Sequence, residues 1–278
     1  MIAFLSAILA GIAVGLSLGL TGSGGSLFAI PLLLYVLNMD MQSAVPISLL
    51  VVGITALSGA VSALRTGLLH LKPTLVFGAA GIVAAPAGLR LGALTPDIYQ
   101  EFAFVLLVFV MAGRMAIESA KPGSARVVRA NLELQGNSGI CRYAKDGRMD
   151  LTLPCIAALV LAGGVVGGLS GFLGVGGGFL IVPALMYVIR MDISFAIGSS
   201  LTIIAMIGIT GGALAGLSVL LSSTPAILFG LGSLGGMFLG RMVAGDLSGK
   251  MLQRVFSLML LATGLFMLYQ LWGNINVV

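Results

Sequence analysis

Residues 19–40, GLTGSGGSLFAIPLLLYVLNMD, are repeated in residues 171–192 as GFLGVGGGFLIVPALMYVIRMD. The two stretches align without a gap at a shift of 152 residues (183 minus 31), which places Pro31 over Pro183. The same shift continues to align glycine, serine and proline positions beyond this stretch. A match of this length in one register predicts that the chain consists of two homologous halves.

The composition places these halves in a membrane. Of the 278 residues, 59% are hydrophobic and 8% are charged, and the mean hydropathy is +1.15, whereas soluble proteins carry about 25% charged residues. The 41 glycines follow no strict period and fall inside apolar runs, which indicates close helix packing or helix breaks. The net charge of +5 comes from basic residues placed as in membrane proteins, so nucleic acid is not an expected partner.

Hydrophobic runs bounded by glycine, proline and charged residues predict an all-α, polytopic transmembrane protein of ten segments. The segments are approximately 2–20, 26–38, 42–64, 73–94 and 99–118, then 152–171, 178–189, 193–219, 225–245 and 252–272. We therefore divide the chain into a first transmembrane repeat (1–118), a basic linker (119–150) and a second transmembrane repeat (151–278). The first segment lacks a basic leader and is expected to be a retained helix.

Each half has five segments, an odd number, so the second half is expected to be inverted relative to the first. Lysine and arginine gather in the linker and in the loops on its side, which predicts a cytoplasmic linker and outward-facing termini in a cell inner membrane. Arg90 is the basic residue expected toward the outer face. The two cysteines, Cys141 and Cys155, show no metal-ligand spacing and are interpreted as structural bystanders.

The second segment of each half is too short to span the membrane. Residues 27–37 and 179–189 are eleven residues each, about 16 Å of helix against a hydrocarbon core of about 30 Å. Each follows a glycine-rich run and contains a proline. Paired broken helices at matching positions of inverted halves point to a transporter binding site, although the sequence leaves open whether these segments span or re-enter.

The duplicated glycine-rich run with its following proline, the ten apolar segments and the basic central loop resemble the TauE/SafE sulfite exporter family, also called the toluene-sulfonate uptake permease family. The resemblance covers nearly the whole chain outside the linker. It implies transport of small sulfur-containing anions such as sulfite, sulfonates, sulfoacetate or thiosulfate, usually without ATP. Ser26 departs from the pattern because the second half has Gly178 at that position.

The glycine-rich breaks are the candidate anion site, because free backbone N–H groups and the helix macrodipole attract negative charge at a helix N-terminus. Candidate residues in the first half are Thr21, Gly22, Ser23, Gly24, Gly25 and Ser26, and those in the second half are Gly174, Gly176, Gly177 and Gly178. The alternative interpretation is that these glycines only permit tight helix packing.

Further candidates come from neighbouring segments. Ser48 and Ser200 match across the repeat and are the first choices among hydroxyl donors, although most membrane serines bond to their own backbone. Arg90 is a candidate anion ligand with a snorkelling interface anchor as the alternative, whereas Arg241 is interpreted mainly as an interface anchor. His70 is expected to be a solvated loop residue rather than a proton relay.

These observations predict a secondary transporter that carries a small anion by alternating access between the two halves. No catalytic motif is present in the sequence, and no cofactor or metal is expected. The expected partners are the anion and the lipid bilayer, with a second copy of the chain in a homo-oligomer as a further candidate. Two alternatives stay open. An anion channel would give unitary currents, and a membrane scaffold would bind no anion while holding a partner protein.

Overall fold

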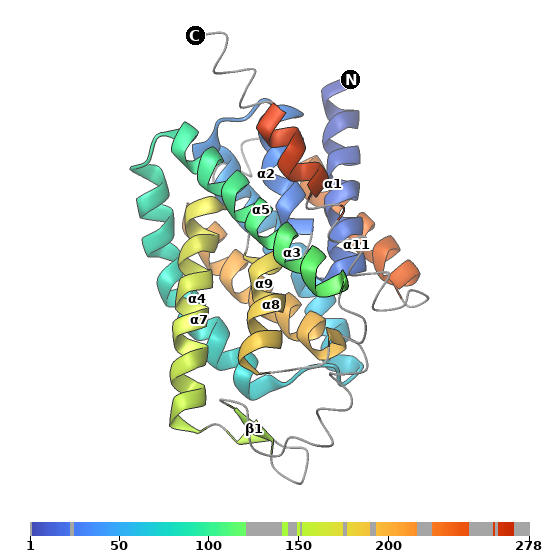
Figure 1. Cartoon of the computed structure of the whole chain (residues 1–278). Helices are drawn as coiled ribbons and strands as arrows, with labels where there is room; N and C mark the ends of the chain where they lie inside the picture. Colours follow the sequence, from blue (N-terminus) through green and yellow to red (C-terminus); the bar gives the residue numbers. More distant parts are fainter. Residues whose placement is uncertain are drawn as a thin grey trace.

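The computed structural model describes residues 2–22, 25–120, 141–143, 149–150, 152–174, 177–189, 193–215, 224–244, 258 and 261–269 (Figure 1). Its helices are α1 (Ile2–Thr21), α2 (Gly25–Tyr35), α3 (Met41–Arg65), α4 (Leu71–Ala93), α5 (Asp97–Ala120), α7 (Leu153–Leu173), α8 (Gly178–Val188), α9 (Ile193–Ala215) and α11 (Thr224–Ala244). Residues 258 and 261–269 are also helical. The predicted polytopic all-α fold is confirmed.

Six helices among the described residues are long and apolar enough to cross a membrane: α1, α3, α4, α7, α9 and α11. The short helices α2 and α8 have eleven residues each, as expected, and each contains a proline, Pro31 or Pro183. At 1.5 Å per residue neither crosses a hydrocarbon core alone.

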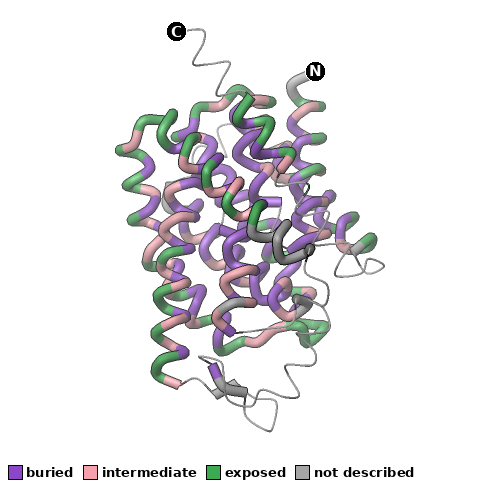
Figure 2. The backbone as a smooth tube through the Cα atoms, viewed as in Figure 1, coloured by how far each residue is buried: buried purple, intermediate pink, exposed green. Residues whose placement is uncertain are grey.

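Helices α3 and α9 form the centre of the bundle and run antiparallel. Gly53 of α3 lies against Gly208 of α9, and Gly59 lies against Leu201. Residue numbers therefore decrease along α9 in the direction in which they increase along α3. In the apolar windows of both helices 67% of the residues are buried, against 33–44% in the other four spanning helices. Figure 2 shows this difference as a buried interior surrounded by helices with exposed outer faces.

Two further helix pairs flank the centre, and glycine lies along both contacts. In the pair of α1 with α11, Gly11, Gly15 and Gly19 lie against the backbone of Phe229, Ser233 and Met237. In the pair of α7 with α4, Gly163, Gly167 and Gly171 lie against Phe77, Gly81 and Ala85. Adding 152 to these residue numbers of α1 gives those of α7, and adding 152 to those of α4 gives those of α11.

These contacts explain why so many glycines sit inside helices. Lipid tails are as apolar as leucine, so helices in a bilayer gain little from hydrophobic burial and associate through close packing of small residues. Large apolar side chains face outward instead, and Val83 of α4 and Phe238 of α11 are 80% and 69% exposed. Outer faces of this kind suit contact with lipid.

The linker contains two short strands that the sequence analysis did not predict. Strand β1 (Arg142–Tyr143) pairs antiparallel with β2 (Met149–Asp150). They lie at the end of the bundle opposite the first turn of α1 (Figure 1). Helix α5 extends two residues into the predicted linker, and residues 121–140 and 144–148 lie outside the described part of the chain.

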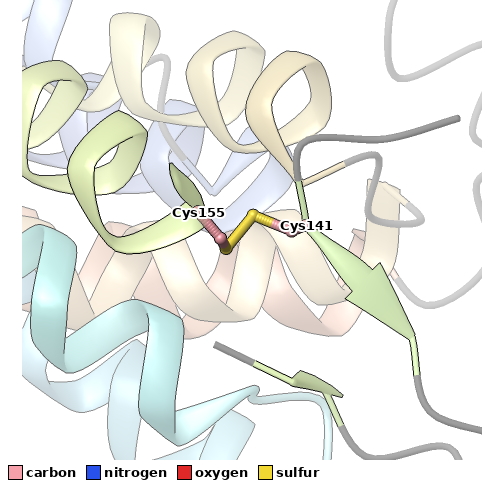
Figure 3. Close-up of a disulfide and its surroundings, with 2 residues drawn as sticks. All are labelled: Cys141 and Cys155. Carbon is pink, nitrogen blue, oxygen red and sulfur yellow. A yellow bond between two sulfur atoms is a disulfide. The ribbon is translucent and has the colours of Figure 1, made fainter. Parts of the chain in front are cut away.

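The interpretation of the two cysteines as bystanders was wrong. Cys141 and Cys155 form a disulfide, with the sulfur atoms 1.99 Å apart (Figure 3). Both side chains are buried. The bond joins the linker to the third residue of α7, so it fixes the entry of the chain into the second half.

Candidate functional site

The first glycine-rich break lies between α1 and α2. Helix α1 ends at Thr21, and Gly22 follows in the left-handed conformation with φ +69° while its N–H donates to Leu18 O at 2.7 Å. This is the backbone conformation that ends a helix at glycine, because a Cβ would be strained there. Helix α2 then begins at Gly25.

The second break begins with the same geometry. Gly174 follows α7 with φ +69°, and its N–H donates to Ser170 O at 2.9 Å. Gly177, with φ +65°, then precedes α8, which begins at Gly178, and no side chain caps this helix start. The amides of the first turn of α8 therefore lack a side-chain acceptor at the N-cap, and the helix dipole places partial positive charge there.

Each break is held by a serine from the other half. Ser200 of α9 donates to Gly22 O at 3.1 Å, and Ser48 of α3 donates to Gly174 O. Both hydroxyls also lie within hydrogen-bond distance of a carbonyl one turn earlier in their own helix, Ile197 O and Val45 O, each at 2.8 Å. The two serines that the repeat register placed first are thus the two that reach the breaks.

The left-handed glycines are also tightly enclosed by the opposite half. A Cβ on Gly22 would collide with the side chain of Ile197, and a Cβ on Gly174 would lie 2.7 Å from the Cα of Val45. Close helix packing, the alternative interpretation of these glycines, therefore describes these two positions correctly. A packing role and a role in ligand binding are compatible. The carbonyls of Gly22 and Gly174 accept hydrogen bonds from the serines, whereas the N-termini of α2 and α8 lie further along the chain.

The remaining first-half candidates are divided between α1 and α2. Thr21 Oγ1 donates to Ser17 O at 2.8 Å within α1. A Cβ on Gly25 would lie 2.6 Å from the amide nitrogen of Leu18, so α2 begins directly against α1. Ser26 is fully buried in the first turn of α2. Ser23, Gly24 and Gly176 lie outside the described residues.

The two arginines have different surroundings from those expected. Arg90 is exposed, two residues from both Gly88 and Gly92, which face Phe172 of α7, so Arg90 lies on the far side of α4 from the second break. Arg241 instead donates from Nη1 to Gly59 O at 3.2 Å and Ser58 O at 3.4 Å on α3.

Arg241 also lies close to the first break. Its amide nitrogen would be 3.0 Å from a Cβ on Gly19, three residues before Gly22. Of the two arginines, Arg241 is therefore the one that the packing brings to the neighbourhood of a break. Its side chain bridges α11 to the central helix α3, which is more than the anchoring at an interface that the sequence predicted.

Two buried hydroxyls, those of Ser170 and Ser199, have no hydrogen-bond partner in the structure. Ser170 of α7 lies beside the second break: its Oγ would be 3.4 Å from a Cβ on Gly177. Ser170 was not among the predicted site residues, because its counterpart in the first half is Leu18 and the repeat register gave no signal. Its polar character in an apolar helix was the available clue.

His70 is not the solvated loop residue that the sequence predicted. Its ring stacks on Phe195 at a centroid distance of 4.6 Å, and burial lowers the pKa of its imidazole. His70 lies immediately before α4, so its contact with Phe195 joins the start of α4 to the start of α9.

Two apolar cavities lie away from the breaks. One of about 640 Å³ is lined by residues of α1 and α11, including Ile8, Ile12 and Phe238. The other, of about 290 Å³, is lined by α3, α4 and α9, including Leu57 and Ile82. Neither is lined by charged side chains or by the first turn of a helix, so neither resembles the anion site expected at the breaks.

Comparison with known proteins agrees with the family resemblance that the sequence motifs indicate. The sulfite exporter TauE/SafE family matches residues 7–267. A probable membrane transporter protein of Xylella fastidiosa (strain Temecula1) is 31% identical over 265 residues, which cover 94% of each chain. The probable membrane transporter proteins YdhB and YunE of Bacillus subtilis are 26% and 24% identical, covering 71% and 89% of this chain and 73% and 89% of their own. No solved structure matches the chain. The protein is a polytopic helical membrane protein that belongs to the sulfite exporter TauE/SafE family.

Proposed function

We propose that this protein is a secondary transporter of a small anion. Relatives that match nearly its whole length are named probable membrane transporter proteins, and its family is named for sulfite export. The observation that carries the mechanism is the reciprocal bonding of the breaks, in which Ser200 holds Gly22 and Ser48 holds Gly174. A movement of one half relative to the other would therefore change a hydrogen bond at each break.

The proposed movement is a rocking of two inverted halves about the pair α3 and α9. The antiparallel course of these two corresponding helices supports the inversion, because equivalent helices in inverted halves run in opposite senses. The glycine contacts of α1 with α11 and of α4 with α7 also exchange under the same shift. Alternating access by such halves exposes a central site first to one face and then to the other.

An anion is the proposed cargo because both breaks are followed by helix N-termini. Backbone N–H groups and the macrodipole favour negative charge there, and helix α8 begins without a side-chain cap. Sulfite, sulfoacetate, thiosulfate and related sulfur oxyanions are the first substrates to test because of the family name.

We further propose that the linker faces the cytoplasm and that both termini face outward. Arg65 and Lys72 flank the loop from α3 to α4, near the end of the bundle where β1 lies (Figure 1). Six further lysines and arginines belong to residues 119–150: Lys121, Arg126, Arg129, Arg142, Lys145 and Arg148. An excess of basic residues in loops is characteristic of the cytoplasmic side.

The direct test is anion flux through the purified protein in liposomes. Vesicles loaded with sulfite, sulfoacetate, thiosulfate or sulfate are diluted into medium with labelled anion, and saturable exchange by one of them is the expected result. Unitary currents in voltage-clamped bilayers would instead identify a channel. Neither flux nor anion binding, together with a co-purifying partner protein, would identify a scaffold and overturn the proposal.

A further inference from the structure

The hydroxyl of Ser170 is an unused polar group beside the second break. Ser170 is 1% exposed, and its Oγ has no hydrogen-bond partner. A buried hydroxyl without a partner lowers the stability of the fold, so natural proteins rarely keep one. An apolar residue at this position would avoid that loss of stability.

The surroundings of Ser170 place this hydroxyl beside the start of α8. Its Oγ lies 3.4 Å and its Cβ 3.1 Å from the position that a Cβ on Gly177 would occupy. Gly177 is the N-cap residue of α8, and its carbonyl accepts hydrogen bonds from Leu180 N at 2.9 Å and Ile181 N at 3.0 Å. The amides of Gly178 and Phe179 precede these and have no acceptor within the helix.

The other half lacks this arrangement. The residue of α1 that corresponds to Ser170 is Leu18, which packs against Gly25 at the start of α2. The first break therefore has an aliphatic side chain where the second has a hydroxyl. The repeat gives Gly22 and Gly174 the same left-handed conformation, whereas the positions of Leu18 and Ser170 differ in chemistry.

We propose that the transported anion binds at the second break, where Ser170 Oγ donates a hydrogen bond to it together with the first amides of α8. One hydroxyl and two amides at the start of α8 supply three donors, which suit a small oxyanion with several acceptor oxygens. This assignment rests on the proposed function and narrows it to one of the two breaks. The bound anion accepts a hydrogen bond from the Ser170 hydroxyl, which has no partner when the anion is absent.

The proposal predicts opposite effects of one substitution on stability and on binding. Ser170→Ala removes a buried hydroxyl that has no partner, so the anion-free protein is expected to unfold at the same temperature or higher. The same substitution removes a hydrogen bond to a charged ligand, worth about 1.5–3 kcal/mol, so anion affinity is expected to fall about ten- to a hundredfold.

Ser233→Ala is the matched control. Ser233 is also a buried helical serine, but its Oγ lies 2.6 Å from Thr55 Oγ1 and donates to Gly230 O at 2.8 Å. Its replacement removes one hydrogen bond between α11 and α3 and one within α11. It is expected to lower the unfolding temperature and to leave anion affinity unchanged, the reverse of the pattern at Ser170.

The experiment measures thermal unfolding and isothermal titration of the full-length detergent-purified protein, wild type and both variants, with sulfite and sulfate. Weaker binding in Ser170→Ala with undiminished stability supports the assignment. Wild-type affinity in Ser170→Ala overturns it while the proposed transport function stands. No binding or flux of any tested anion with wild-type protein instead overturns the proposed function.

Discussion

Ser200 donates its hydroxyl hydrogen to the carbonyl oxygen of Gly22 at 3.1 Å, so a side chain of the second half holds the backbone break of the first. Ser200→Ala and Ser48→Ala are each expected to lower the free energy of unfolding by about 1–2 kcal/mol, because a buried carbonyl loses its donor. Equilibrium unfolding in detergent measures this. Effects below about 0.3 kcal/mol in both variants would contradict a role for these bonds in joining the halves.

Two adjacent glycines of α7, Gly163 and Gly164, test the close packing of α7 on α4. A Cβ on Gly163 would collide with Phe77 O of α4, whereas a Cβ on Gly164 would meet no atom within 4 Å. Gly163→Ala is therefore expected to lower the unfolding temperature clearly. Gly164→Ala is expected to keep or raise it, because alanine favours a helix by up to about 1 kcal/mol over glycine. Equal effects would exclude the packing of α4 on α7 described above.

The two arginines give a second matched pair. Arg241→Gln is expected to reduce anion exchange strongly, because Arg241 joins α11 to α3 beside the first break. Arg90→Gln is expected to change exchange less than threefold, about 0.6 kcal/mol, because Arg90 is exposed on the far side of α4. Initial rates in liposomes decide between them, and a greater loss with Arg90→Gln would reverse this assignment.

His70 gives the fold a dependence on pH. Burial lowers the pKa of His70 from its usual value of 6.5, so the fold favours the neutral ring while the unfolded chain takes up a proton near pH 6.5. The stabilisation is complete above pH 6.5 and is lost as the pH falls below it. Thermal unfolding at pH 5.5 and 7.5 is expected to show a drop in wild type. Because His70 is the single histidine, a drop of equal size in His70→Gln would assign it to other groups.

The cysteine pair tests the orientation of the linker. Disulfides persist in oxidising compartments and are reduced in the cytoplasm. A cytoplasmic linker therefore predicts free Cys141 and Cys155 thiols in intact cells, and the disulfide forms when purified protein meets an oxidant such as glutathione disulfide. Acid quenching and thiol alkylation before electrophoresis measure this, with Cys141→Ser as the control. A fully oxidised pair in growing cells would place the linker outside.

The repeat made most of the fold predictable. The glycine-rich runs and prolines gave the two breaks, and hydrophobic length gave every described helix to within a few residues. The register also selected Ser48 and Ser200, because a contact between two halves related by a repeat is expected to occur twice. Cys141 and Cys155 were missed because a sequence separation of 14 does not reveal how the linker folds back onto α7.

The parts that could not be predicted are those where the halves differ. Ser170 faces the second break, and Leu18 occupies the matching position in the first. Arg241 and Arg90 looked nearly equivalent in sequence, but a shift of one residue turns a side chain by about 100° around a helix. That rotation separates an arginine that contacts α3 from one that is exposed.

The glycine-lined contacts also bear on how such a chain is made. α1 rests on α11, and α7 rests on α4, so the first helix of each half packs on a helix of the other. Neither half alone covers its own glycine stripe. With halves inverted as proposed, a half produced as a separate polypeptide would have to insert in both directions and assemble as an antiparallel pair. In the fused chain, one translation product supplies the two orientations in equal number.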